Sequence, residues 1–147
     1  GPEHVNIGNG GLPQVRYAAL KSGEHRAVTV MEPFISLGVK EGAHIVAASF
    51  YRGGEVVAAD LDADERKAYY DAENKAVDLI NGDFYKYAHH LTAHAKGALQ
   101  PNELSRAFVR YKHVDYYDET LFTRAYEWLK DRDMADGSTE HERLVVG

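Results

Sequence analysis

Residues 44–61, HIVAASFYRGGEVVAADL, carry the pattern that decides the predicted fold class. The runs His44 to Tyr51 and Val56 to Leu61 are both rich in β-forming residues, and Arg52-Gly53-Gly54-Glu55 separates them. A Gly-Gly pair supplies the positive φ angles that a tight hairpin turn needs. The segment therefore predicts two antiparallel strands joined by a turn.

Two shorter stretches before this segment, residues 15–19 and 28–31, alternate with the period of a strand. Residues 21–24 can turn the chain between them. Pro33 interrupts the pattern, because proline is excluded from central strands. We therefore expect three to five antiparallel strands within the first 61 residues.

From Asp62 onward the apolar period becomes that of helices. Asp62 with Glu65 resembles a capping box for a first helix, which Asn81-Gly82 ends. Asp83 can cap a second helix that stops near Gly97. A third helix is expected over 101–111, with Pro101 in its first turn, and a fourth after Asp115 or Asp118. The apolar stripes expected on these helices are Tyr69, Ala72, Ala76, Ile80; Phe84, Tyr87, Ala88, Leu91, Ala95; Leu104, Ala107, Phe108, Tyr111; and Leu121, Phe122, Ala125, Trp128, Leu129.

Strands followed by helices are the pattern of an α+β domain. The prediction is an antiparallel sheet of three to five strands packed against about four helices. We expect one domain over residues 13–136, since no linker composition divides it. Residues 1–12 are interpreted as a tag remnant and a flexible arm, and residues 137–147 as a tail or a short added strand.

The composition of the 147 residues excludes several classes of site. There is no cysteine, so a disulfide, a thiolate metal site and a cysteine nucleophile are excluded. No apolar run approaches the roughly 20 residues of a membrane span. The net charge of −6 argues against a uniformly basic nucleic-acid-binding surface. We expect a soluble, cytoplasmic protein without a cofactor and without a membrane partner.

Charge alternates along the helical part of the sequence. Residues 62–83 and 115–136 each carry −4, whereas residues 84–114 carry +4 and four histidines. One interpretation is that these segments neutralise each other within the molecule. Another is an anionic-ligand site, for a nucleotide or another phosphate-bearing molecule. Its residues would be Arg106, Arg110 and His113 on one helical face, with Tyr85 and Tyr87 stacking on the ligand.

Ten tyrosines are many for one domain, and tyrosine is enriched at interfaces. Tyr70, Tyr117, Asp118 and Glu119 are the residues predicted to contact a partner. The favoured function is a non-catalytic binding protein, an inhibitor or regulator of a protein partner, acting through an acidic, tyrosine-rich surface. It could mimic nucleic acid at a basic site or serve as an assembly subunit, and small acidic proteins of this type are often phage or mobile-element encoded. A homodimer is a further alternative.

Catalytic signals in the sequence are weak. His90 and His94 have the spacing of half a helical metal site, but Leu91 stands where a zinc protease has its glutamate. No Gly-x-Ser-x-Gly elbow and no Gly-Lys-Ser/Thr loop occurs. We therefore expect no metal and no enzymatic activity. The remaining alternative is an enzyme with acid–base groups among His90, His94, His113 and Tyr87.

Overall fold

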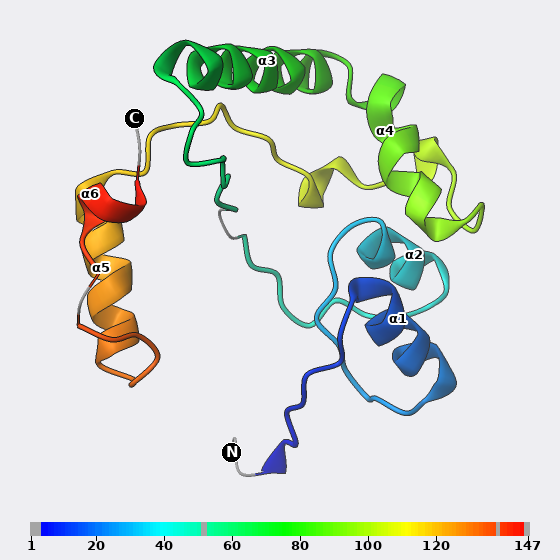
Figure 1. Cartoon of the computed structure of the whole chain (residues 1–147). Helices are drawn as coiled ribbons and strands as arrows, with labels where there is room; N and C mark the ends of the chain where they lie inside the picture. The colour runs from blue at the N-terminus through cyan, green and yellow to red at the C-terminus, as the bar shows by residue number, and fades with distance from the viewer. Residues whose placement is uncertain (1–3, 51–52, 138, 146–147) are drawn as a thin grey trace. The chain divides into compact units, whose positions relative to one another are not determined.

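The computed structural model describes residues 4–50, 53–137 and 139–145, and its regular elements are helices (Figure 1). No β-strand occurs in these ranges, so the predicted α+β fold with an antiparallel sheet is wrong. The chain divides into two compact units. Unit 1 comprises Gly1–Glu55 and Ala76–Tyr111, and unit 2 comprises Val56–Lys75 and Lys112–Gly147. The single-domain interpretation stays a prediction.

The first predicted strand lies within a helix, α1 (Pro13–Ser22). Pro13 occupies the first helical turn, where its missing N–H costs nothing. Gly23 ends the helix at φ 79°, and its N–H donates to the Leu20 carbonyl at 3.1 Å. This proline and this glycine outweigh the short alternation over residues 15–19, so that the strand prediction was wrong.

The hairpin predicted over residues 44–61 is also absent from the described residues, 44–50 and 53–61. Val46 is 89% exposed and Val56 is 97% exposed, so the described residues of both runs are largely uncovered. A hairpin without a covered face is only marginally stable, which accounts for the missing strands. Residues 51 and 52, part of the predicted turn, lie outside the described residues. A helix that the sequence analysis missed, α2 (Phe34–Lys40), precedes this segment and contacts α1.

The first two predicted helices and their caps are confirmed. In α3 (Ala63–Gly82) the Glu65 N–H donates to Asp62 Oδ1 at 2.9 Å, and the Asp62 N–H donates to Glu65 Oε2 at 3.0 Å. This is the reciprocal capping box. In α4 (Phe84–Thr92) the Asp83 carboxylate accepts from the Lys86 N–H at 3.4 Å. A 3₁₀ turn, η2 (Ala93–Ala95), continues α4.

The third predicted helix is replaced by two 3₁₀ turns, η3 (Pro101–Glu103) and η4 (Arg106–Phe108). Leu104 and Ser105 between them are extended. The Glu103 carboxylate accepts from the Gln100 N–H at 2.8 Å and from Lys40 Nζ at 2.7 Å. These bonds and the buried Leu104 side chain favour a tight turn over a continued helix.

The fourth predicted helix is confirmed as α5 (Glu119–Lys130). Of its two expected starts the structure has Asp118, whose Oδ1 accepts from the Leu121 N–H at 2.9 Å. The segment predicted as a tail or short strand contains a helical turn, α6 (His141–Leu144), which contacts α5, and no strand within its described residues. Residues 146 and 147 lie outside the described residues.

Among the described residues, every buried apolar side chain belongs to unit 1. The core consists of Tyr17, Phe34, Leu37, Phe84, Ala88, Ala95, Leu99 and Leu104. It contains Phe84, Ala88 and Ala95 of the stripe predicted for the second helix, and Leu91 packs partly buried against it. In unit 2, by contrast, no described residue is buried, and the inward stripe predicted for α5 leaves Leu121 40% exposed and Trp128 52% exposed. None of the described helices combines the length and apolar character needed to cross a membrane.

Candidate functional site

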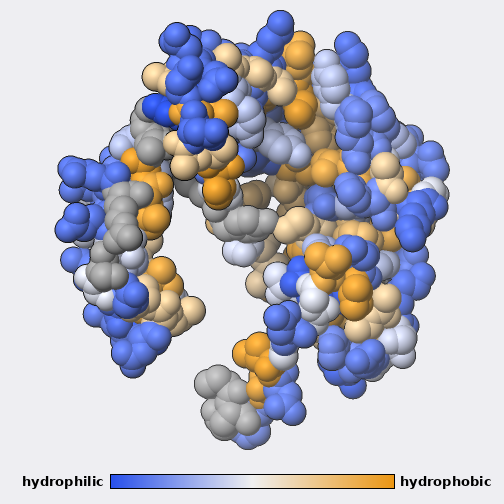
Figure 2. Space-filling view, viewed as in Figure 1, coloured by the Kyte–Doolittle hydropathy of each residue, from blue (hydrophilic) through white to orange (hydrophobic). Residues whose placement is uncertain are grey.

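The candidate site is the exposed surface of α5 and α6 in unit 2. Apolar and hydrophilic side chains lie on different sides of this helix pair (Figure 2). Four large side chains there are exposed, and we call them the α5 surface: Tyr116, Tyr117, Leu121 and Trp128. Two of them precede the Asp118 cap and two follow it in α5. The cap fixes where the helix begins and therefore which residues share a helical face.

Next to this surface, two aromatic rings of α5 stack against each other, and we call this pair the aromatic wall. Phe122 and Tyr126 are one turn apart, with ring centroids 5.5 Å apart and planes 9° from parallel. The ring edges of Tyr117 and His141 pack against Phe122 at 6.1 and 5.3 Å between centroids. The four rings hold α6 against α5.

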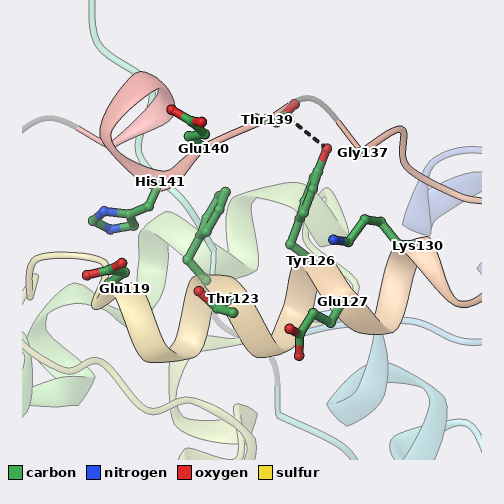
Figure 3. A pocket seen from close by; sticks show the side chains of 10 residues that line it. Glu119, Thr123, Tyr126, Glu127, Lys130, Gly137, Thr139, Glu140 and His141 are labelled. Carbon is green, nitrogen blue, oxygen red and sulfur yellow. Dashed lines mark hydrogen bonds between the residues drawn. The ribbon is translucent and has the colours of Figure 1, made fainter.

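Hydrogen bonds fix the segment between the two helices. The Tyr126 hydroxyl donates to the Asp136 carbonyl and accepts from the Thr139 N–H at 3.3 Å (Figure 3). His141 Nε2 donates to the Tyr117 carbonyl at 2.6 Å. These bonds tie the chain after α5 back onto the helix.

A cavity of about 250 Å³ lies between α5 and the returning segment (Figure 3). We call it the α5–α6 pocket. Its lining residues are Glu119, Phe122, Thr123, Tyr126, Glu127, Lys130, Gly137, Thr139, Glu140 and His141. Three of these are carboxylates, and Lys130 Nζ lies 5.5 Å from the centre of the Tyr126 ring. The pocket combines an aromatic wall with negative charge.

The predicted partner-contact residues all lie in unit 2, in its part of α3 and at the start of α5. Tyr117, Asp118 and Glu119 meet at the start of α5, where Asp118 serves as the cap and Glu119 lines the pocket. Tyr70 lies half-buried on α3, with its ring 6.1 Å from that of Tyr69. Sequence reasoning missed the roles of Tyr126 and His141. The spacing of Phe122 and Tyr126, four apart on a well-predicted helix, was the signal that could have shown the aromatic wall.

The predicted basic face is not formed, because the helix that would carry it is absent. Arg106 lies in η4, where its Nη2 donates to the Asn81 carbonyl at 2.9 Å. Arg110 lies in an irregular stretch with its guanidinium 5.9 Å from the Phe50 ring. His113 belongs to unit 2. Without a continuous helix, the spacing of four and seven residues no longer implies a common helical face.

The stacking residues predicted for that site lie on α4. Tyr85 is exposed, with its ring 5.3 Å from the Phe84 ring. Tyr87 is half-buried, with Lys86 Nζ 5.4 Å from its ring centre. Since the two tyrosines are two positions apart on a helix, they lie on different faces. The anionic-ligand site stays a prediction.

The paired histidines are separated by the end of α4. His90 lies in α4, with its ring 3.9 Å from that of His89, whereas His94 lies in η2. His94 instead lines a second cavity of about 420 Å³ in unit 1, beside Phe34 and Leu37. Within the described ranges, no three histidine or carboxylate side chains are grouped to hold a metal ion. A catalytic role for His90, His94, His113 or Tyr87 stays an untested alternative.

The groups with shifted pKa values lie in unit 1. Burial raises the pKa of Glu32, although Ser36 donates to both of its oxygens, at 2.7 and 3.0 Å. The hydrogen bond from Tyr17 and then that from Lys21 lower the pKa of Glu41. The same contact, after burial, raises the pKa of Tyr17. These shifts accompany bonds between α1, α2 and the adjacent loops, which is a structural role.

No protein-family model matches this chain, and no curated protein or solved structure matches it either.

Proposed function

We propose that the protein is a non-catalytic binding protein, a regulator or inhibitor, whose unit 2 docks on a basic surface of a protein partner in the cytoplasm. The observation that carries the proposal is the absence of any buried residue among the described residues of unit 2. Its helices nevertheless carry large apolar side chains, including Leu121 and Trp128.

Isolated helices of this length are marginal in water, and most helical stability in proteins comes from packing an apolar face. The α5 surface presents exposed apolar side chains that no described residue of unit 2 buries. A partner that covers it would supply the missing burial, and exposed tyrosine and tryptophan are the side chains that most often anchor such contacts.

The net negative charge of unit 2 favours a partner with a basic surface. Unit 2 contains 15 acidic and 8 basic residues, a net charge of −7, whereas unit 1 carries +1. A complementary surface is therefore basic, and attraction between the two speeds their encounter. A second copy of this chain would bring another −7 to the interface, which disfavours a homodimer through this face. A basic site that ordinarily holds nucleic acid fits this requirement.

The test uses the full chain and a synthetic amphipathic peptide with leucine on one helical face and arginine on the other. Calorimetry should show binding that weakens by roughly tenfold or more between about 50 and about 300 mM salt. Circular dichroism should show helix gained on mixing. Leu121→Ala with Trp128→Ala should weaken binding, and Val39→Ala, an exposed apolar position in unit 1, is the matched control.

The same peptide with glutamate in place of arginine should not bind. Binding that ignores salt, or that survives the Leu121 and Trp128 substitutions unchanged, would overturn the proposal. So would dimerisation of the free chain that these two substitutions abolish.

A further inference from the structure

The α5–α6 pocket is smaller than the cavities that hold whole metabolites. Its volume is about 250 Å³, whereas pockets for small-molecule ligands run from about 300 to 1,000 Å³. A single side chain is the size of occupant that such a cavity accepts.

The aromatic wall favours a planar cation in that space. The rings of Phe122 and Tyr126 stack nearly parallel, with centroids 5.5 Å apart, and an aromatic face attracts cations. Lys130 already lies over the Tyr126 ring within the usual distance for this interaction. A guanidinium stacks flat on such a surface, which a compact ammonium group does not.

The carboxylates around the aromatic wall are an independent indication that the occupant is a cation. Glu119, Glu127 and Glu140 line the pocket, and within the described part of the chain their carboxylates form no ion pair or hydrogen bond. With Lys130 as the cation among the lining residues, the pocket is acidic. A guanidinium can stack on the rings and donate its edge N–H groups to a carboxylate at the same time.

We propose that the α5–α6 pocket receives an arginine side chain of the partner. This inference rests on the proposed function, since it names the partner group that the acidic surface recognises. Tyr117 and Leu121 on the α5 surface would then contact the partner next to this arginine. The pocket would fix the position of the partner along α5.

The test is a titration of the full chain with acetyl-arginine N-methylamide, followed by amide NMR shifts. Binding is expected to be weak, on the order of millimolar, because the probe is small and brings no surrounding interface. The shifts should concentrate at Phe122, Tyr126 and His141. The neutral isostere acetyl-citrulline N-methylamide should bind at least about tenfold more weakly, and the lysine analogue should lie between the two.

Two substitutions probe the two halves of the pocket. Glu140→Gln should weaken binding of the arginine probe several-fold, whereas Glu142→Gln, an exposed glutamate of α6 outside the lining, should leave it unchanged. Phe122→Leu should weaken it while Trp128→Leu should not. Circular dichroism of each variant controls for loss of helix.

Equal binding of arginine and citrulline, or equal effects of the Glu140 and Glu142 changes, would overturn the pocket assignment. The two proposals fail separately. Loss of the arginine probe with retained docking of the basic peptide refutes the pocket alone. Binding of the probe without any docking of the peptide refutes the proposed function and leaves the pocket as a site for free guanidinium compounds.

Discussion

Helices α4 and α5 have similar N-terminal caps but differ in how far their apolar faces are buried. Each starts at an aspartate whose side chain accepts a backbone N–H, Asp83 for α4 and Asp118 for α5. Each has an apolar stripe. α4 buries Phe84, Ala88 and Thr92, whereas α5 buries none of its residues. Caps and amphipathic patterns thus prepare a helix for burial, and only its surroundings decide whether the burial occurs.

The largest expected contrast between the units is in unfolding free energy. Leu104→Ala in the unit 1 core should cost about 2–5 kcal/mol, because it removes buried methyl groups and leaves a cavity. Trp128→Ala on the α5 surface should change the free energy by no more than about 0.5 kcal/mol. Urea unfolding of both variants measures this. A cost for Trp128→Ala similar to that for Leu104→Ala would show that unit 2 has a core of its own in solution.

Hydrogen exchange sharpens the contrast helix by helix. Amides of α5 should exchange within about tenfold of the rate of an unstructured chain, since little packing opposes local opening. Amides of α4 should exchange at least roughly a hundredfold more slowly than those of α5. On addition of the basic peptide the protection of α5 should rise and that of α4 should stay constant. Equal protection in the free chain would contradict the distinction drawn here.

The smallest expected effect concerns acid. Hydrogen bonds from Tyr17 to Glu41 and from Lys40 to Glu103 are the first causes that lower the pKa values of these two glutamates. A lowered pKa contributes stability above the ordinary glutamate value of 4.5, and this contribution is lost as pH falls through the lowered values. Unit 1 should therefore lose stability in acid.

Glu32 opposes this trend, because burial raises its pKa, so its contribution is present at low pH and lost as pH rises. In thermal unfolding between about pH 3 and pH 6, the double variant Glu41→Gln with Glu103→Gln should lose less stability on acidification than the unmodified chain. Glu24→Gln, which makes none of these contacts, is the control. An unchanged acid loss in the double variant would remove these two groups as the cause.

Local signals predicted local structure well in this chain. The predicted capping box of Asp62 and Glu65 and the predicted caps at Asp83 and Asp118 are confirmed, because each is formed by residues three positions apart. The strand predictions failed where alternation alone was used. At residues 15–19 the proline before and the glycine after were stronger signals. The described residues of 44–61 are largely exposed.

The predicted contact of Tyr117 and Glu119 with a partner stays a prediction. Tyr117 belongs to the α5 surface, and Glu119 lines the α5–α6 pocket. His141 could not be found in this way, because its position depends on the return of the chain after α5. The helix expected to carry Arg106 and Arg110 is absent for the same kind of reason: Lys40, some 60 positions away, bonds Glu103 in the turn that replaces it.

Unit 1 is assembled from two stretches of chain, and its synthesis must follow that order. Ser36 Oγ accepts from the Ser105 N–H at 2.9 Å, and Lys40 reaches the Ala98 carbonyl at 3.0 Å. During synthesis, the side chains of α1 and α2 therefore cannot complete their core until Leu99 and Leu104 have left the ribosomal exit tunnel. During that interval Phe34 and Leu37 are exposed, and the intervening residues 56–75 emerge before either stretch has its core. A nascent chain stalled before residue 99 should be a chaperone client, whereas one released after residue 111 should not need one for unit 1.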